Sequence, residues 1–433
     1  MAQETVPTRD EIPDQYKFNA PSMFASEAAW EREVEELGDA IRVLAAFEGR
    51  LGEGPEVLAK ALDVMAVLTE RLGKVYVYAS LSYAVNMRDQ AAAMRVGRAR
   101  DLFGRFAAAQ AFFDPELLFI GQEKLARWMD QEPRLEILRH YVDDLFRKQA
   151  HVRSTEVESL LGMLSDPFSG VSSIAGALTD ADFVFEPAVA SDGTEIEVTQ
   201  GSLRKILGDP DREARRTAWE HYRDQYLAYR NTLATSLTTS LKQNVFRMRA
   251  RRYDSTLEMA LFRHAIPTEV YHNLIDTFRR HLPTWHRYWA VRRKALGVDT
   301  LHPYDIWAPL TDRRVEIPYQ QAVNWICEGL APLGEDYVAT LRRGVMDQRW
   351  VDVYPNQGKR SGAFSSGRKG TYPFICMSYN EDIFSLSTLA HELGHSMHSY
   401  LTWEHQPFLY EDYSLFVAEV ASNLHQALVR RRR

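Results

Sequence analysis

Apolar and charged residues alternate at spacings of three and four along most of the chain, which is the pattern of amphipathic helices. The pattern is clearest across residues 27–161, where one run has apolar residues at Val57, Leu58, Ala61, Leu62, Met65 and Leu68. We expect breaks at the GEGP turn of residues 52–55 and at Asp114-Pro115, because glycine and proline interrupt helices. The spacing therefore predicts a helical N-terminal region.

A change to strand-like spacing marks the end of this region. The segments 183–185 and 195–198 flank Asp192-Gly193, and this dipeptide between alternating residues is a strong hairpin signal. We therefore expect an N-terminal helical region, residues 1–200, that ends in a β-hairpin.

Helical spacing returns in the second region, residues 201–433. It resumes after Asp209-Pro210, which fits an N-cap followed by a proline in the first turn, and restarts at Ile266-Pro267. Residues 361–367 and 372–377 then read as two short strands around a glycine-containing loop. The expected fold is mainly α, with a small hairpin and a few short strands.

Composition and charge exclude several classes of protein. Of the 433 residues, 45% are hydrophobic and 26% charged, as in soluble globular proteins, and the net charge of −7 indicates no general affinity for nucleic acid or anionic membranes. Two cysteines, Cys327 and Cys376, are too few for a disulfide framework, which fits a reducing compartment. We see no secretory signal and no apolar run of 18 residues, so a cytoplasmic location is expected.

The most specific motif is HELGH at residues 391–395. Histidines four residues apart project from one helix face about 6 Å apart along the axis, so both rings can reach one ion. Glu392, beside the first histidine, can accept a proton from water on the metal. The apolar stripe of this helix lies on another face, at Leu386, Leu389, Leu393, Met397 and Tyr400. The pattern predicts a zinc-dependent peptidase with its metal in a cleft.

A catalytic zinc site needs a third protein ligand, and three residues compete for that role. His398 shares the helix face, but ligands spread over about 10 Å of one helix axis do not converge on one ion. We therefore expect His398 to support the site by packing or by contacting a ligand. His405 would have to fold back from a loop. Glu419 is favoured, because a turn after His405 and an antiparallel second helix would return it to the metal.

These segments resemble the oligoendopeptidase F group of zinc peptidases, relatives of thimet oligopeptidase. Residues 391–400, HELGHSMHSY, are similar to the family's zinc-binding helix, and residues 416–422, FVAEVAS, to the segment that holds its third ligand. Residues 358–367, GKRSGAFSSG, resemble its substrate-side strand and loop. The resemblance runs nearly end to end, with further similar segments at 9–13, 253–261 and 266–267.

The resemblance implies one zinc ion held by His391, His395 and Glu419, with Glu392 as general base. It also implies a large helical body around a deep channel that admits short peptides and excludes folded proteins. The expected activity is therefore hydrolysis of internal bonds in oligopeptides, with no nucleic-acid or membrane partner. The sequence does not indicate an oligomeric state.

The strand that carries Gly362, Ala363, Phe364 and Ser365 is the expected substrate-binding segment. An extended peptide can pair with such a strand through its backbone, which would explain limited side-chain specificity. A structural hairpin beside the cleft is the alternative.

The chain departs from the family near its end. Family members continue beyond the third ligand with helices that carry tyrosine and histidine residues thought to bind the tetrahedral intermediate, whereas this chain stops at Arg433. We therefore expect a truncated form that hydrolyses peptides slowly or not at all.

Two other functions fit the same motif. One is a helical zinc carboxypeptidase or dipeptidyl carboxypeptidase, which would need a cationic side chain to capture the substrate's terminal carboxylate. The other is a non-catalytic helical scaffold that binds zinc or peptides without cleaving them.

Overall fold

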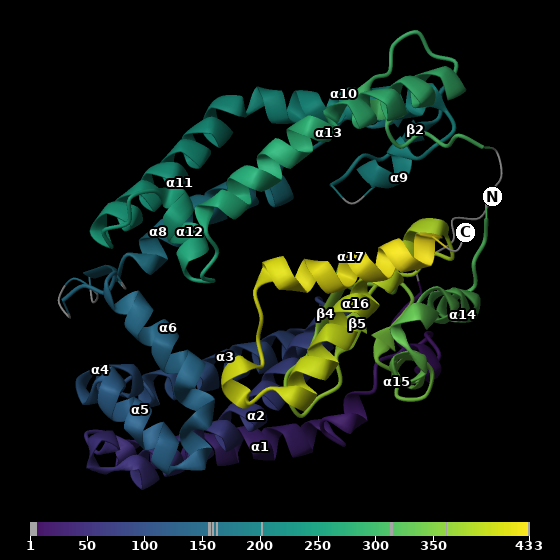
Figure 1. Ribbon diagram of the computed structural model, residues 1–433. Helices are drawn as coiled ribbons and strands as arrows, with labels where there is room; N and C mark the ends of the chain where they lie inside the picture. The colour runs from purple at the N-terminus through teal and green to yellow at the C-terminus, as the bar shows by residue number, and fades with distance from the viewer. Residues whose placement is uncertain are drawn as a thin grey trace. The chain divides into compact units, whose positions relative to one another are not determined.

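The computed structural model describes residues 7–431, except 155–156, 158–159, 162, 201, 312–314 and 361. Helices dominate these residues and only short strands interrupt them, as expected (Figure 1). The described residues exclude Ser361, Arg432 and Arg433. They also exclude part of the helical stretch that was expected to reach residue 161. None of the described helices combines the length and apolar character needed to cross a membrane.

The chain forms two compact units. Unit 1 contains Met1–Arg147 and Val315–Arg433, and unit 2 contains Lys148–Arg314. These limits differ from the expected division at residue 200. The reason is local packing: the strand before the hairpin turn is hydrogen-bonded to the helix after it, with the Val189 amide donating to the Thr217 hydroxyl at 2.8 Å. The hairpin and the helices that follow it are therefore one unit.

The N-terminal part of unit 1 is a helical layer around one apolar core. Its helices are α1 (Glu27–Ala40), α2 (Pro55–Val85), α3 (Gln90–Ala109), α4 (Phe113–Ile120), α5 (Gln122–Gln131) and α6 (Arg139–Gln149). The expected break at 52–55 is confirmed, since α2 begins at Pro55. The expected break near Asp114-Pro115 lies a few residues earlier, because α3 ends at Ala109 and α4 begins at Phe113. Both residues are in the first turn of α4, where proline is tolerated because its missing N–H has no helical partner.

The C-terminal part of unit 1 carries the sheet and the motif helix. It comprises α14 (Tyr319–Gly329), α15 (Glu335–Met346), β3 (Val351–Asp352), β4 (Phe364–Ser366), β5 (Phe374–Cys376), α16 (Ile383–His405) and α17 (Leu415–Arg431). The strand order is β3-β5-β4, with β3 parallel and β4 antiparallel to β5. Both expected strands are confirmed, and both contact α16. The third strand, β3, was missed because two residues are too few to show alternation.

A buried ion network joins the start of the chain to this sheet. The Asp352 carboxylate is fully buried and accepts hydrogen bonds from Arg9 at 2.8 Å and from the Phe18 amide at 3.2 Å. The Lys359 ammonium lies 2.7 Å from the same carboxylate. Despite the cost of burial, these partners hold the pKa of Asp352 below its usual value. These contacts therefore hold the N-terminal segment around Arg9 against the sheet that borders α16.

Unit 2 contains the hairpin and a set of long helices. Its elements are α8 (Ser165–Gly176), a π-helical turn (Ala177–Asp182), β1 (Ala188–Val189), β2 (Glu195–Ile196), α9 (Leu203–Leu207), α10 (Arg212–Ala228), α11 (Arg230–Ala250), α12 (Thr256–Phe262) and α13 (Thr268–Ala295). Short 3-10 turns connect the helices of both units, at Asp14–Tyr16, Ala20–Ser22, Ile41–Phe47, Leu51–Glu53, Pro133–Leu138, Pro303–Asp305, Ala331–Leu333 and Phe408–Tyr410.

Two local expectations in unit 2 need correction. The hairpin pairs Ala188 with Ile196, so its first strand lies closer to the turn than residues 183–185. Phe183 and Phe185 instead pack against aromatic residues of α10. The N-cap of α10 is Asp211, not Asp209, because the Asp211 carboxylate accepts hydrogen bonds from the second and third amides of the helix. The restart at Pro267 is confirmed.

Candidate metal centre

Helix α16 is fixed at both ends and along one face. The Asp382 side chain caps its first turn by accepting a hydrogen bond from the Ser385 amide at 2.6 Å. At its other end, the Lys369 ammonium donates to the Trp403 and Gln406 carbonyls. The expected apolar stripe is confirmed, with Leu386, Leu389, Leu393 and Met397 buried and Tyr400 partly buried. The side chains of His391 and His395 are 24% and 17% exposed, on another face of the helix.

Helix α17 runs antiparallel to α16 and lies directly beside it (Figure 1). The contact is close because Gly394 has no side chain: a Cβ atom there would lie 2.5 Å from the Ser422 Cα and 2.8 Å from the Ala421 carbonyl oxygen. Ser422 lies one turn after Glu419, so this approach sets how near the Glu419 carboxylate comes to the two histidines. The expected turn and antiparallel return of the chain after His405 are confirmed.

Replacing Gly394 with alanine should push the two helices apart. We expect the free energy of unfolding of the metal-free chain to fall by about 1–3 kcal/mol, as for other overpacked sites, and zinc affinity to fall with it. Urea unfolding and a zinc titration measure the two effects. The control is Gly97→Ala in α3, where a Cβ meets nothing within 4 Å and should add about 0.5–1 kcal/mol of stability. Equal changes in the free energy of unfolding and in zinc affinity for the two variants would contradict this role for Gly394.

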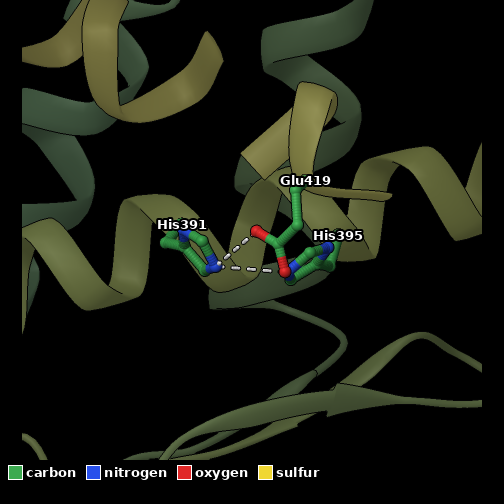
Figure 2. A group of neighbouring side chains, drawn as sticks. All are labelled: His391, His395 and Glu419. Carbon is green, nitrogen blue, oxygen red and sulfur yellow. Dashed lines mark hydrogen bonds and ion pairs between the residues drawn. The ribbon is translucent and has the colours of Figure 1, made fainter. Parts of the chain in front are cut away.

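Three side chains converge between these helices. His391 and His395 extend from α16 and Glu419 extends from α17 towards a common point (Figure 2). The two histidine Nε2 atoms are 3.2 Å apart. The Glu419 oxygens lie 3.5 Å from Nε2 of His391 and 3.8 Å from Nε2 of His395. Among the described residues, no other group of three or more histidine, cysteine or acidic side chains is placed to hold a metal.

The geometry of these atoms fits a tetrahedral metal ion. Ligand atoms about 2.0–2.2 Å from a tetrahedral ion stand about 3.3–3.6 Å apart. The three observed separations, 3.2, 3.5 and 3.8 Å, approximate one triangular face of such a tetrahedron. Two imidazole nitrogens with one carboxylate oxygen also form a donor set of catalytic zinc sites, which leave the fourth position open. The residues therefore fit a catalytic zinc ion.

Glu392 lies beside this group and is only 6% exposed. Burial raises its pKa to about 7, against the opposing effects of His391 and of a hydrogen bond from the Ser365 amide. Its Oε2 atom is buried and has no hydrogen-bond partner. A carboxylate beside the candidate metal site with one oxygen that has no protein partner suits proton transfer.

The expected substrate-binding residues lie in and just before β4. Gly362 has a φ of +85°, a conformation that favours glycine, and Ala363 leads into the strand. Phe364 pairs with Cys376 of β5, and Ser365 pairs with Ile375. The Ser365 hydroxyl also lies 2.9 Å from the hydroxyl of Ser396, which is fully buried on α16. This contact ties β4 to the motif helix one turn after Glu392.

The other candidate ligands do not reach the group. His398 stacks on Tyr413 with ring centroids 3.8 Å apart, and its Nδ1 is buried without a hydrogen-bond partner. His405 is exposed at the end of α16 and faces Glu404. Sequence reasoning missed Gln426, whose Oε1 lies 3.2 Å from His391 Nδ1. The available signal was its position seven residues after Glu419, which puts both on one face of α17.

Comparisons with known proteins match the chain over nearly its whole length. The model of a family described as peptidase family M3 matches residues 206–433, and one described as oligopeptidase F matches residues 116–185. The chain is 37% identical to oligopeptidase PepF of Bacillus subtilis, over 98% of this chain and 63% of that protein. It is 35% identical to group B oligopeptidase PepB of Streptococcus agalactiae, over 97% of this chain and 70% of that protein.

The fold is also shared with solved structures. A crystal structure from Chlamydophila abortus aligns with a TM-score of 0.82 and 30% identity, over 99% of this chain and 72% of that one. The chain thus spans less than two thirds of the Bacillus relative and about seven tenths of the other two proteins.

Proposed function

The chain belongs to peptidase family M3, and we propose on that basis that it is a zinc-dependent endopeptidase for short oligopeptides. The observation that carries the proposal is the convergence of His391, His395 and Glu419 at the spacing of a tetrahedral face. A deep channel that admits only short peptides is part of this proposal. So is the cytoplasmic location that the sparse cysteines favour.

In the proposed mechanism the three ligands bind the metal and Glu392 transfers the proton. His391, His395 and Glu419 hold one zinc ion, which when bound would lower the pKa of water towards about 7 and polarise the scissile carbonyl. Glu392 accepts a proton from the attacking water and then gives it to the leaving amine. Its buried Oε2 atom makes no hydrogen bond within the protein, so its acceptor capacity is unused.

Strand β4 supplies the proposed substrate-binding edge. The Ile375 amide donates to the Trp350 carbonyl, so the backbone groups of Ile375 point towards β3 and away from β4. Its antiparallel partner Ser365 therefore points its own backbone groups away from β5, to the open side of β4. A peptide in extended form can add to that edge as another strand. The Ser365 amide interacts with Glu392, so a peptide on this edge would pair with the remaining backbone groups of the strand and would lie beside the proton acceptor. We propose Gly362, Ala363, Phe364 and Ser365 as this edge.

The products of a peptide blocked at both ends test the endopeptidase proposal. We expect cleavage of an internal bond in an acetylated and amidated peptide of about ten residues, with zinc in slight excess. Mass spectrometry over several hours identifies the fragments, and zinc buffer without protein is the blank. Cleavage only of peptides with a free carboxyl terminus, releasing one residue or a dipeptide, would instead indicate a carboxypeptidase.

The same experiment separates catalysis from binding. Peptide affinity is measured in parallel by fluorescence anisotropy with the zinc-loaded chain. If the chain binds zinc and peptide but releases no product, the activity proposal is wrong and the non-catalytic binding function is supported. If it binds no zinc, the whole proposal is wrong.

A further inference from the structure

The amide of Gln426 lies between the first histidine of the motif and the preceding turn of α16. Its Oε1 atom is 3.2 Å from His391 Nδ1. Its Nε2 atom is 3.1 Å from the Ser387 carbonyl oxygen and 2.9 Å from the Ser387 hydroxyl. One side chain of α17 thus connects two successive turns of the motif helix, and it does so on the side of the His391 ring away from Glu419.

The Ser387 carbonyl determines which way this amide points. A carbonyl oxygen can only accept a hydrogen bond, so the NH₂ end of Gln426 must face Ser387. The opposite end of the amide, the oxygen, then faces the His391 ring. A flipped amide would place two oxygens against each other at Ser387, which is unfavourable because neither has a proton to donate.

The amide orientation in turn determines the tautomer of His391. An amide oxygen only accepts, so His391 must carry its proton on Nδ1 and donate it to Gln426. The lone pair of the neutral ring is then on Nε2. That atom is the one that faces His395 and Glu419. The hydrogen bonds that run from Ser387 through Gln426 to His391 therefore leave the lone pair of His391 Nε2 facing the candidate metal centre.

We propose that Gln426 is a positioning residue that holds His391 in its metal-binding tautomer and ring orientation. This inference rests on the proposed zinc centre, and it assigns a role to a residue outside the ligand set. Gln426 is not one of the three converging side chains and acts through its contact with His391. Removal of such a partner typically lowers metal affinity by about 10–100-fold.

Zinc affinity of the full chain, measured by competition with a chromophoric chelator, tests the proposal. Gln426→Met keeps the length of the side chain but cannot accept the Nδ1 proton, and we expect a loss of about 10–100-fold. Gln426→Glu can accept that proton, and the Ser387 hydroxyl can turn its own proton to the new carboxylate. We expect the glutamate variant to bind zinc within about threefold of the unsubstituted chain.

The glutamate variant also distinguishes positioning from helix packing. If Gln426 acted only by donating a hydrogen bond to the Ser387 carbonyl, glutamate would fail as badly as methionine, because neither side chain can donate to that oxygen. The matched control is Arg430→Met, which removes another α17 contact to Ser387, at 3.2 Å, without touching His391. Arg430→Met should leave zinc affinity unchanged. Thermal melting of the metal-free variants shows whether each is folded.

Three results would overturn the proposal. Zinc affinity of Gln426→Met within threefold of the unsubstituted chain would show that the histidine needs no partner. Equal losses in Gln426→Met and Gln426→Glu would show that the contact of Gln426 with the Ser387 carbonyl matters, and not its contact with His391. Failure of the unsubstituted chain to bind zinc would overturn the metal centre itself, and that failure is recognised before any variant is compared.

Discussion

Replacing Glu392 with glutamine should lower the rate of peptide cleavage by about 10²–10⁴ while zinc stays bound, because glutamine has the same shape but cannot accept a proton. Glu392 is not one of the three converging side chains, so its substitution leaves the candidate ligand set unchanged. Its burial beside His391 and its unoccupied Oε2 place it to move the proton. Product formation from the blocked peptide, together with the zinc content of the same samples, measures both parts of the prediction.

The matched control for this variant is Glu404→Gln on the same helix. Glu404 is exposed and its carboxylate lies 3.9 Å from the ring of the neighbouring His405, far from the convergent group, so its substitution should change neither cleavage nor zinc content. Retention of a near-normal cleavage rate by Glu392→Gln would remove Glu392 from the mechanism. Loss of zinc along with the rate would mean that the variant reports on the metal site and not on proton transfer.

Replacing His395 with alanine should weaken zinc binding by more than about 100-fold, beyond the loss expected for a residue that only supports a ligand. His395 contributes one corner of the triangular face, and its removal leaves one nitrogen and one carboxylate. A chelator competition titration at fixed pH measures the change. The fixed pH matters because protons compete with zinc for histidine.

His405→Ala is the control for this second prediction. His405 ends the same helix, its side chain is 69% exposed, and it is not part of the convergent group. Its substitution should leave zinc affinity unchanged. Equal zinc affinities for His395→Ala and the unsubstituted chain would show that His395 is not a ligand.

The sequence predicted the motif helix well because two periodic signals agreed there. The histidine spacing and the apolar stripe from Leu386 to Met397 both required a helix with two distinct faces. Glu419 was predicted because the segment after His405 had only to turn and form an antiparallel helix to return to the metal. Both inferences used local patterns along one short part of the chain.

Two of the features that sequence reasoning missed depend on contacts between residues distant in the sequence. The spacing of seven residues places Gln426 on the same face of α17 as Glu419, but no sequence pattern shows that its amide meets His391 and Ser387, because that contact follows from how α17 packs on α16. The close approach at Gly394 has the same origin. Asp211 caps α10 although Asp209-Pro210 matched the usual signal better, since the side chain that reaches the free amides decides the cap.

Anomalous diffraction at the zinc absorption edge, from crystals of the zinc-loaded chain, tests the central claim most directly. We predict one strong peak within about 2.0–2.2 Å of Nε2 of His391, Nε2 of His395 and an oxygen of Glu419. The absence of a peak between α16 and α17, or a peak held instead by His398 or His405, would contradict the metal centre proposed for this chain.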